Sequence, residues 1–303
     1  MNDGWKRCFV LWGAVTLLLL AGCAPTDPPS AEQLLSALSY AILQPEVTCA
    51  ELREEFDLSY LPLPNDPTDG GMEFEEHWLP GPKGQTLRAW YMPVADEHGT
   101  VILSPGAVGP MTCYLFSAIL LTEGGWSVVM YDYQGFGGST GDPSLQSLCP
   151  DLEAVVDWTR EYTGCGRVTL MGMSLGAIPS VAVAVTRPDA VNAVVLDSPV
   201  ALGEEIERFQ YLMAGQSQEV ISLLDPSLLT ENIIAQMMQP LLVFAHEEDF
   251  VTPPETVELL YERAGGPKEI VKFTGLEHAH GQFQSTGEYS AELEDFLEAI
   301  WQR

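Results

Sequence analysis

Hydrophobic positions along the chain change between short apolar runs and longer stretches of helical spacing. Between residues 72 and 92, apolar and polar residues alternate on both sides of a Gly-Pro-Lys-Gly turn, which predicts an antiparallel hairpin of strands 72–79 and 87–92. The later short apolar runs are typical of strands buried on both faces. They lie at residues 100–103, 127–131, 168–171, 193–196, 241–245 and 269–273, and helical stretches such as 152–162, 255–263 and 291–302 lie between or after them. This alternation predicts an α/β fold with a mostly parallel, twisted sheet and helices on both faces.

Two regions of helical spacing fall outside this alternation. Leu34, Leu35, Leu38 and Ile42 recur on one helical face and predict an accessory amphipathic helix before the core. A longer helical insert is expected over residues 201–239, between two of the strands. Its larger apolar residues are Phe209, Tyr211, Leu212, Met213, Leu223 and Leu224.

The amino terminus has the pattern of an export signal. Basic Lys6 and Arg7 precede an apolar stretch, 9–20, that is short for a membrane span, and the sequence Leu-Ala-Gly-Cys ends at Cys23. This pattern resembles the lipobox of bacterial lipoproteins. The resemblance implies cleavage before Cys23, a lipid anchor on that residue and attachment to the cell envelope, and Ala24 resembles the pattern sent to an outer membrane. The alternative is an ordinary cleaved signal or an uncut anchor.

The charge of the chain and its cysteines indicate which partners, disulfides and metal sites to expect. The chain has 13 Lys and Arg against 43 Asp and Glu, a formal charge of -30, so nucleic acid is not an expected partner because its phosphates would be repelled. The even set Cys49, Cys113, Cys149 and Cys165 suits two disulfides in an oxidising compartment. Pairing of Cys149 with Cys165 is disfavoured, because the helix expected between them holds its ends roughly 20 Å apart. No cysteine or histidine spacing fits a zinc site, and we expect neither a metal nor a cofactor.

The sequence Gly172-Met173-Ser174-Leu175-Gly176 carries the strongest chemical signal. It follows the apolar run 168–171 and precedes a helix of small residues from Ala177. A nucleophile on a tight turn between strand and helix needs glycine on both sides, since side chains there would collide with neighbouring backbone. Ser174 is therefore the candidate nucleophile.

A longer set of motifs resembles the α/β-hydrolase superfamily, in the branch of small esterases, lipases and serine aminopeptidases. Residues 132–139, DYQGFGGS, look like its DYRGFGxS turn, with Gln134 in place of Arg. Residues 104–107, SPGA, stand where the family has a His-Gly oxyanion motif, with Pro105 in place of His. The resemblance runs from about Glu73 to the end of the chain and implies a helical lid at 201–239.

The family order of serine, acid and histidine assigns the other catalytic residues. Asp249 matches the family's G-x-x-D-x-x-x-P acid loop, with His246 in place of Gly, and Asp197 is the alternative acid. His278 matches G-x-x-H and is expected to be the general base, with His280 as the alternative. His77, His98 and His246 are interpreted as structural or surface residues. The oxyanion hole is expected from the backbone N–H groups of Ala107 and Leu175.

These motifs predict a serine hydrolase that forms an acyl-enzyme on Ser174 and acts on a small ester or related acyl substrate. The alternatives are a serine aminopeptidase or amidase, and a non-catalytic surface lipoprotein that keeps the fold. Apolar residues of the insert either form an acyl pocket or only pack the lid onto the body. The expected organisation is a signal peptide at 1–22, a tether and accessory segment at 23–71 and the hydrolase domain at 72–303.

Overall fold

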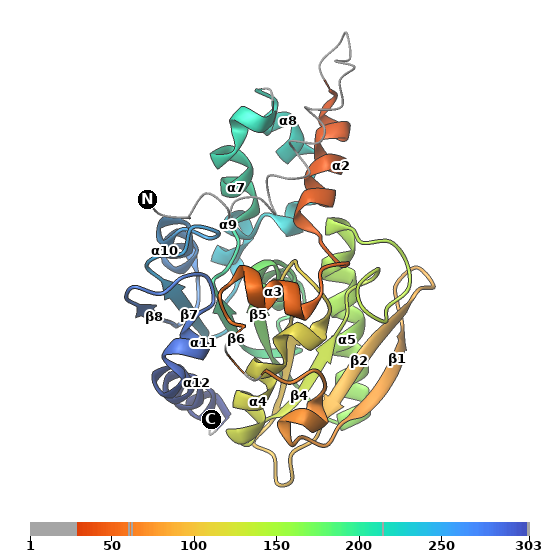
Figure 1. The fold of residues 1–303 in the computed structure, drawn as a ribbon, viewed down its shortest axis with the longest axis vertical. Helices are drawn as coiled ribbons and strands as arrows, with labels where there is room; N and C mark the ends of the chain where they lie inside the picture. The colour runs from red at the N-terminus through yellow and green to blue at the C-terminus, as the bar shows by residue number, and fades with distance from the viewer. Residues whose placement is uncertain (1–28, 60, 62, 214, 302–303) are drawn as a thin grey trace.

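The computed structural model describes residues 29–59, 61, 63–213 and 215–301 (Figure 1). The expected signal peptide, the lipidation site Cys23 and most of the tether lie outside these residues. Among the described residues, no helix combines the length and apolar character needed to span a membrane.

An eight-stranded sheet in the order β1-β2-β4-β3-β5-β6-β7-β8 forms the centre of the molecule. The hairpin of β1 and β2 and the pairing of β2 with β4 are antiparallel, and the remaining neighbours are parallel. The strands are β1 (Glu75–Pro80), β2 (Thr86–Met92), β3 (Thr100–Ser104), β4 (Ser127–Tyr131), β5 (Val168–Met173), β6 (Val191–Asp197), β7 (Leu241–His246) and β8 (Lys268–Phe273). This arrangement confirms the predicted α/β class with a mostly parallel sheet.

Helices cover both faces of the sheet because the buried strands present apolar side chains to each side. One core packs α5 (Leu148–Thr163), α6 (Ala177–Thr186) and α10 (Pro254–Arg263) against the sheet. The opposite core packs α4 (Leu115–Glu123) and α12 (Thr286–Trp301). Both layers are visible in Figure 1. Gly164 ends α5 in the left-handed conformation, with a φ of 72°, which a glycine adopts without steric cost.

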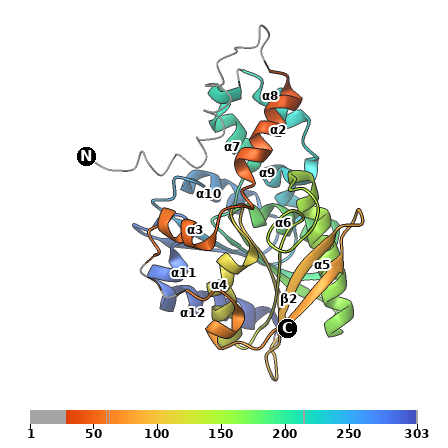
Figure 2. The same cartoon turned by 45° about the vertical axis from the view of Figure 1, so that its right-hand side comes forward.

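The segment between β6 and β7 is helical, as the spacing predicted. It contains α7 (Leu202–Arg208), α8 (Ser217–Ser222), α9 (Thr230–Ile233) and four-residue or shorter 3-10 turns. Helix α2 (Ala31–Ile42) packs beside α8, and the two helices rise together above the sheet (Figures 1 and 2). Helix α3 (Cys49–Glu55) follows α2 and lies lower, in front of the central strands (Figure 1).

Two of the four described cysteines form a disulfide. Cys49 at the start of α3 is bonded to Cys113, with their Cα atoms 4.9 Å apart. Cys149 is a buried free thiol and Cys165 a partly exposed one. The expectation of a second disulfide is therefore wrong, while the argument against pairing Cys149 with Cys165 agrees with the structure, because these residues lie near the two ends of α5.

Candidate active site

Ser174 lies on a sharp turn between β5 and α6. Its φ is 51°, in the left-handed region that side chains rarely adopt, and its side chain is half-buried. The turn needs both flanking glycines: a Cβ added at Gly172 would collide with the carbonyl of Gly176, and one added at Gly176 would collide with the carbonyl of Ser104. The close approach of backbone at these two points produces the strained turn that the GxSxG spacing predicted.

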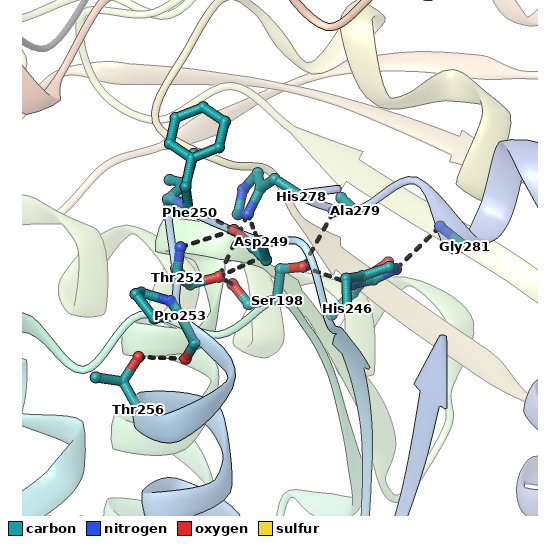
Figure 3. Close-up of polar contacts among 12 residues, drawn as sticks. Ser198, His246, Asp249, Phe250, Thr252, Pro253, Thr256, His278, Ala279 and Gly281 are labelled. Carbon is teal, nitrogen blue, oxygen red and sulfur yellow. Dashed lines mark hydrogen bonds and ion pairs between the residues drawn. The ribbon is translucent and has the colours of Figure 1, made fainter. Parts of the chain in front are cut away.

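Asp249 and His278 form a buried hydrogen-bonded pair (Figure 3). The Oδ2 of Asp249 lies 2.8 Å from the Nδ1 of His278, and the two side chains are only 1% and 8% exposed. Backbone N–H groups of Val251 and Thr252 donate to the Oδ1 of Asp249 at 2.9 and 2.8 Å. Because the Asp249 carboxylate can only accept, Nδ1 of His278 is the nitrogen that donates to it, and Nε2 is left as the basic nitrogen.

Each member of this pair stabilises the charged form of the other. Burial would lower the pKa of His278, but the Asp249 carboxylate and its hydrogen bond outweigh burial and raise that pKa above its usual value. Burial would likewise raise the pKa of Asp249, yet the charge and hydrogen bond of His278 lower it. The acid is therefore ionised at neutral pH and stabilises the imidazolium form of its neighbour.

The two alternative residues have other partners. Asp197 accepts a hydrogen bond from the hydroxyl of Tyr289 at 2.8 Å, and burial raises its pKa to about 6. His280 shares a hydrogen bond of 3.2 Å between its Nδ1 and the Nε2 of Gln284. The carboxylate that contacts a candidate catalytic imidazole is thus that of Asp249, and the imidazole is that of His278.

Ser174, His278, Ala107 and Leu175 all line one cavity of about 440 Å³. This volume is within the range of small-molecule sites. Ala107 follows the end of β3, next to the turn that holds Ser174, and Leu175 is the residue after Ser174. The sequence-predicted nucleophile, base and oxyanion residues therefore meet at one end of the sheet, where β3 and β5 end.

The insert contributes several of its apolar side chains to this cavity. They are Leu202, Ile206, Phe209 and Met213. Tyr211 points to solvent with 60% of its surface exposed, and Leu224 belongs to the buried core. Leu202, Ile206 and Met213 also belong to this core, so the same side chains both line the cavity and pack the insert onto the body.

Two loops near the site carry residues that differ from the family motifs, and hydrogen bonds hold both loops. Gln134, in place of Arg, receives a hydrogen bond of 2.8 Å on its side-chain oxygen from Gln85, and its backbone N–H donates to Asp151. Pro105, in place of His, accepts a hydrogen bond from the Tyr133 hydroxyl through its carbonyl. These hydrogen bonds hold the two loops in place at the positions where the sequence differs from the family motifs.

Sequence reasoning missed two polar residues beside the pair. The hydroxyl of Thr252 donates to Oδ2 of Asp249 at 2.8 Å and lies 3.3 Å from Nδ1 of His278. His246, interpreted from sequence as structural or surface, is buried: its Nδ1 lies 3.0 Å from the Ser198 hydroxyl, and its Nε2 accepts from the N–H of Gly281 at 2.9 Å (Figure 3). Burial lowers its pKa to about 3, so it remains neutral. Its replacement of the family glycine was the only sequence signal for this role.

Comparison with known proteins shows the family of the chain. A family model described as serine aminopeptidase, S33, matches residues 95–239. The uncharacterized protein Rv2307c of Mycobacterium tuberculosis is 33% identical over 199 residues, which are 64% of this chain and 69% of that protein. The uncharacterized protein YfhR of Escherichia coli K12 is 30% identical over 225 residues, 71% of this chain and 77% of YfhR. The chain belongs to the α/β-hydrolase superfamily.

Solved structures of other α/β hydrolases share the fold. The Pyrococcus furiosus esterase Pf2001 superposes with a TM-score of 0.64 at 18% identity, over 78% of this chain and 94% of the esterase. Est1E from Butyrivibrio proteoclasticus, solved with ferulic acid, gives a TM-score of 0.60 at 15% identity, over 75% of this chain and all (100%) of Est1E. Identities this low establish the α/β-hydrolase architecture alone.

Proposed function

We propose that this hydrolase cleaves carboxylic esters through an acyl-enzyme on Ser174. The observation that carries the proposal is the buried Asp249–His278 pair at 2.8 Å, whose imidazole lines the same cavity as Ser174 on its strained turn. An alcohol nucleophile at neutral pH needs a neighbouring base, and a carboxylate at the far nitrogen of that base keeps it in the right tautomer.

The proposed reaction has two halves. In the first, Nε2 of His278 takes the hydroxyl proton of Ser174 as the oxygen attacks the ester carbonyl. The tetrahedral oxyanion accepts hydrogen bonds from the N–H groups of Ala107 and Leu175, and its collapse expels the alcohol, which receives the proton from His278. In the second, His278 deprotonates a water molecule that attacks the acyl-enzyme, and the carboxylic acid leaves as Ser174 regains its proton.

The charge around the site favours an uncharged ester. Arg208 lines the cavity, but its guanidinium donates to the carbonyls of Phe250 and Val251 and forms an ion pair with Glu205. Its charge is therefore already compensated within the wall. Together with the chain charge of -30, this arrangement opposes a strongly anionic substrate.

A serine aminopeptidase is the second candidate, because the matching family model has that description and a carboxylate, Glu205, lines the cavity. An aminopeptidase must bind the ammonium group of its substrate, for which a carboxylate is suited. Burial raises the pKa of Glu205 to about 7, and its charge is shared with Arg208, which weakens this candidate.

The test compares p-nitrophenyl acyl esters with aminoacyl p-nitroanilides on wild type and Ser174→Ala. We expect ester turnover that the substitution reduces by at least about a thousandfold, because no acyl-enzyme can then form, with the thermal midpoint nearly unchanged. Turnover of anilides alone would favour the aminopeptidase. Unchanged ester turnover in Ser174→Ala, or none in the wild type, would reject the proposed mechanism.

We also propose that the mature protein is attached to the bacterial cell envelope, in the outer membrane, by lipid on Cys23. Support comes from the lipobox-like sequence that ends at this residue. A cysteine that carries a diacylglycerol and an amino-terminal acyl chain provides the two lipid signals that stable anchoring requires. Full-length protein should partition with membranes and Cys23→Ser should move to the soluble fraction, whereas membrane attachment of Cys23→Ser would contradict lipidation.

A further inference from the structure

Residues 31–59, here called the N-terminal segment, contribute lining residues to the cavity of the candidate site. The segment contains α2 and α3 and precedes the stretch 95–239 that the family model matches. In both views of the ribbon α2 stands beside the helices of the insert (Figures 1 and 2). The segment thus lies at the site but outside the stretch that the family model matches.

The segment is tied to the loop that carries Ala107. The N–H of Gln44 donates to the carbonyl of Ala107 at 2.9 Å, and the N–H of Gly109 donates back to the carbonyl of Gln44 at 2.9 Å. Five residues later along the segment, the Cys49–Cys113 disulfide adds a covalent link to the same region. Two backbone hydrogen bonds and a disulfide thus fix the segment next to the expected oxyanion hole.

Apolar side chains of the segment form part of the cavity wall. They are Leu38, Ile42, Val47, Leu52, Phe56 and Leu58. The ring of Phe56 lies close to the catalytic pair, with its centroid 6.0 Å from that of the His278 imidazole. Side chains of α7 and the turn after it line the same cavity, so a substrate at Ser174 has apolar groups from both the segment and the insert around it.

We propose that the N-terminal segment builds one wall of an acyl-chain pocket, that this wall gives the enzyme its preference for aliphatic acyl esters, and that the Cys49–Cys113 disulfide holds the wall in place. The inference rests on the proposed esterase function. A cavity with this lining removes methylene groups from water, and each methylene so buried raises kcat/KM about fourfold when the contact is present in the transition state.

Two leucines one turn apart on α2 provide a matched test. Both are partly buried and pack on the core, but Leu38 also lines the cavity, whereas Leu34 is not among the lining residues. The measurement is the ratio of kcat/KM for p-nitrophenyl octanoate to that for p-nitrophenyl acetate. We expect wild type to favour octanoate by at least about tenfold. Leu38→Gln should lower the ratio by about fivefold or more, because octanoate then contacts a polar group, and Leu34→Gln should keep the wild-type ratio.

The disulfide is tested by Cys49→Ser combined with Cys113→Ser, so that neither partner of the broken bond remains as a thiol. Cys165→Ser is the control, since it removes a free thiol that does not line the cavity. The double variant should lose octanoate preference as Leu38→Gln does, while the control should retain it. Thermal midpoints recorded for every variant identify any that fail to fold. Phe56→Ser then replaces a failed Leu38→Gln as a substitution in the wall, and wild type reduced with dithiothreitol replaces a failed double serine variant.

The outcomes separate this inference from the proposed function. Absence of ester turnover in wild type, or turnover that persists in Ser174→Ala, overturns the esterase itself. Ester turnover that depends on Ser174 but shows the same octanoate-to-acetate ratio in wild type, Leu38→Gln and Phe56→Ser overturns the wall alone. A wild-type ratio in the folded double serine variant overturns the role of the disulfide.

Discussion

Replacement of Asp249 by asparagine tests which carboxylate serves the catalytic histidine. The substitution keeps the shape of the side chain but removes the charge 2.8 Å from Nδ1 of His278. For charges about 4 Å apart in an effective dielectric of about 20, the lost stabilisation of the imidazolium is about 4 kcal/mol, close to a thousandfold in rate. An asparagine amide also stabilises the wrong imidazole tautomer, which brings the expected loss of kcat/KM nearer to ten-thousandfold.

Asp197→Asn is the matched control for this prediction. Asp197 is buried and also favours the charged form of His278, but its hydrogen bond is with the Tyr289 hydroxyl. We expect a loss of no more than about tenfold, as for an interaction between charges that share no hydrogen bond. Both variants are assayed with a p-nitrophenyl ester from pH 5 to 9, and thermal melts verify folding. A near-normal Asp249→Asn beside an inactive Asp197→Asn would reassign the acid and refute the reasoning from geometry.

Three further predictions follow from the site. His278→Ala should lower kcat/KM by roughly a thousandfold or more, while His280→Ala should lower it by less than about tenfold; the reverse order would make His280 the base. Because the base must be neutral and Asp249 raises the pKa of His278, activity should fall as pH drops through a value above the usual 6.5 or so for histidine, and an acid limb below pH 6 would contradict this. His246 has a folded pKa of about 3 and an unfolded one of about 6.5, so only the unfolded chain binds its proton between them. Stability should therefore decline as pH falls below about 6.5, and His246→Gln should remove roughly 1.4 kcal/mol of the loss between pH 7.5 and 5.5 in urea titrations; an unchanged pH slope would show that His246 is not held neutral.

The sheet was predictable from sequence because its signals are local. Each expected strand is present with its ends displaced by three residues at most, as in the first strand, expected at 72–79 and observed at Glu75–Pro80. The Ser174 turn was equally predictable from its glycine spacing, although only the collision at Gly172 is local; the one at Gly176 involves the carbonyl of Ser104, at the end of β3. Periodicity and turn chemistry thus determine the framework and the position of the nucleophile.

Contacts between distant segments were not predictable in the same way. The amphipathic spacing at 31–43 predicts that one face of the helix is buried against another part of the protein. It does not indicate that Leu38 lines the cavity and Leu34 does not. The pairing of Cys49 with Cys113 depends on a Cα separation of 4.9 Å across 64 residues of sequence. His246 was interpreted as structural or surface, and only its buried position beside Ser198 gives it defined partners.

The proposed catalytic residues therefore lie on the shared fold, whereas the pocket also depends on segments outside the motifs that carry them. Ser174, Asp249 and His278 are carried by the turn after β5 and the loops after β7 and β8. The wall over them comes from the insert after β6 and from the N-terminal segment. A hydrolase of this fold can thus change substrates by altering the wall while keeping the catalytic residues in place.

The most direct measurement of the central claim is covalent labelling of Ser174. Wild type is incubated with a fluorophosphonate, digested and analysed by mass spectrometry, in parallel with Ser174→Ala. The account predicts one phosphonyl group per chain, located on Ser174 within the Gly172–Gly176 turn, together with loss of ester turnover and no adduct on the variant. Wild-type protein that hydrolyses esters yet carries the label at another residue, or carries none, would contradict it.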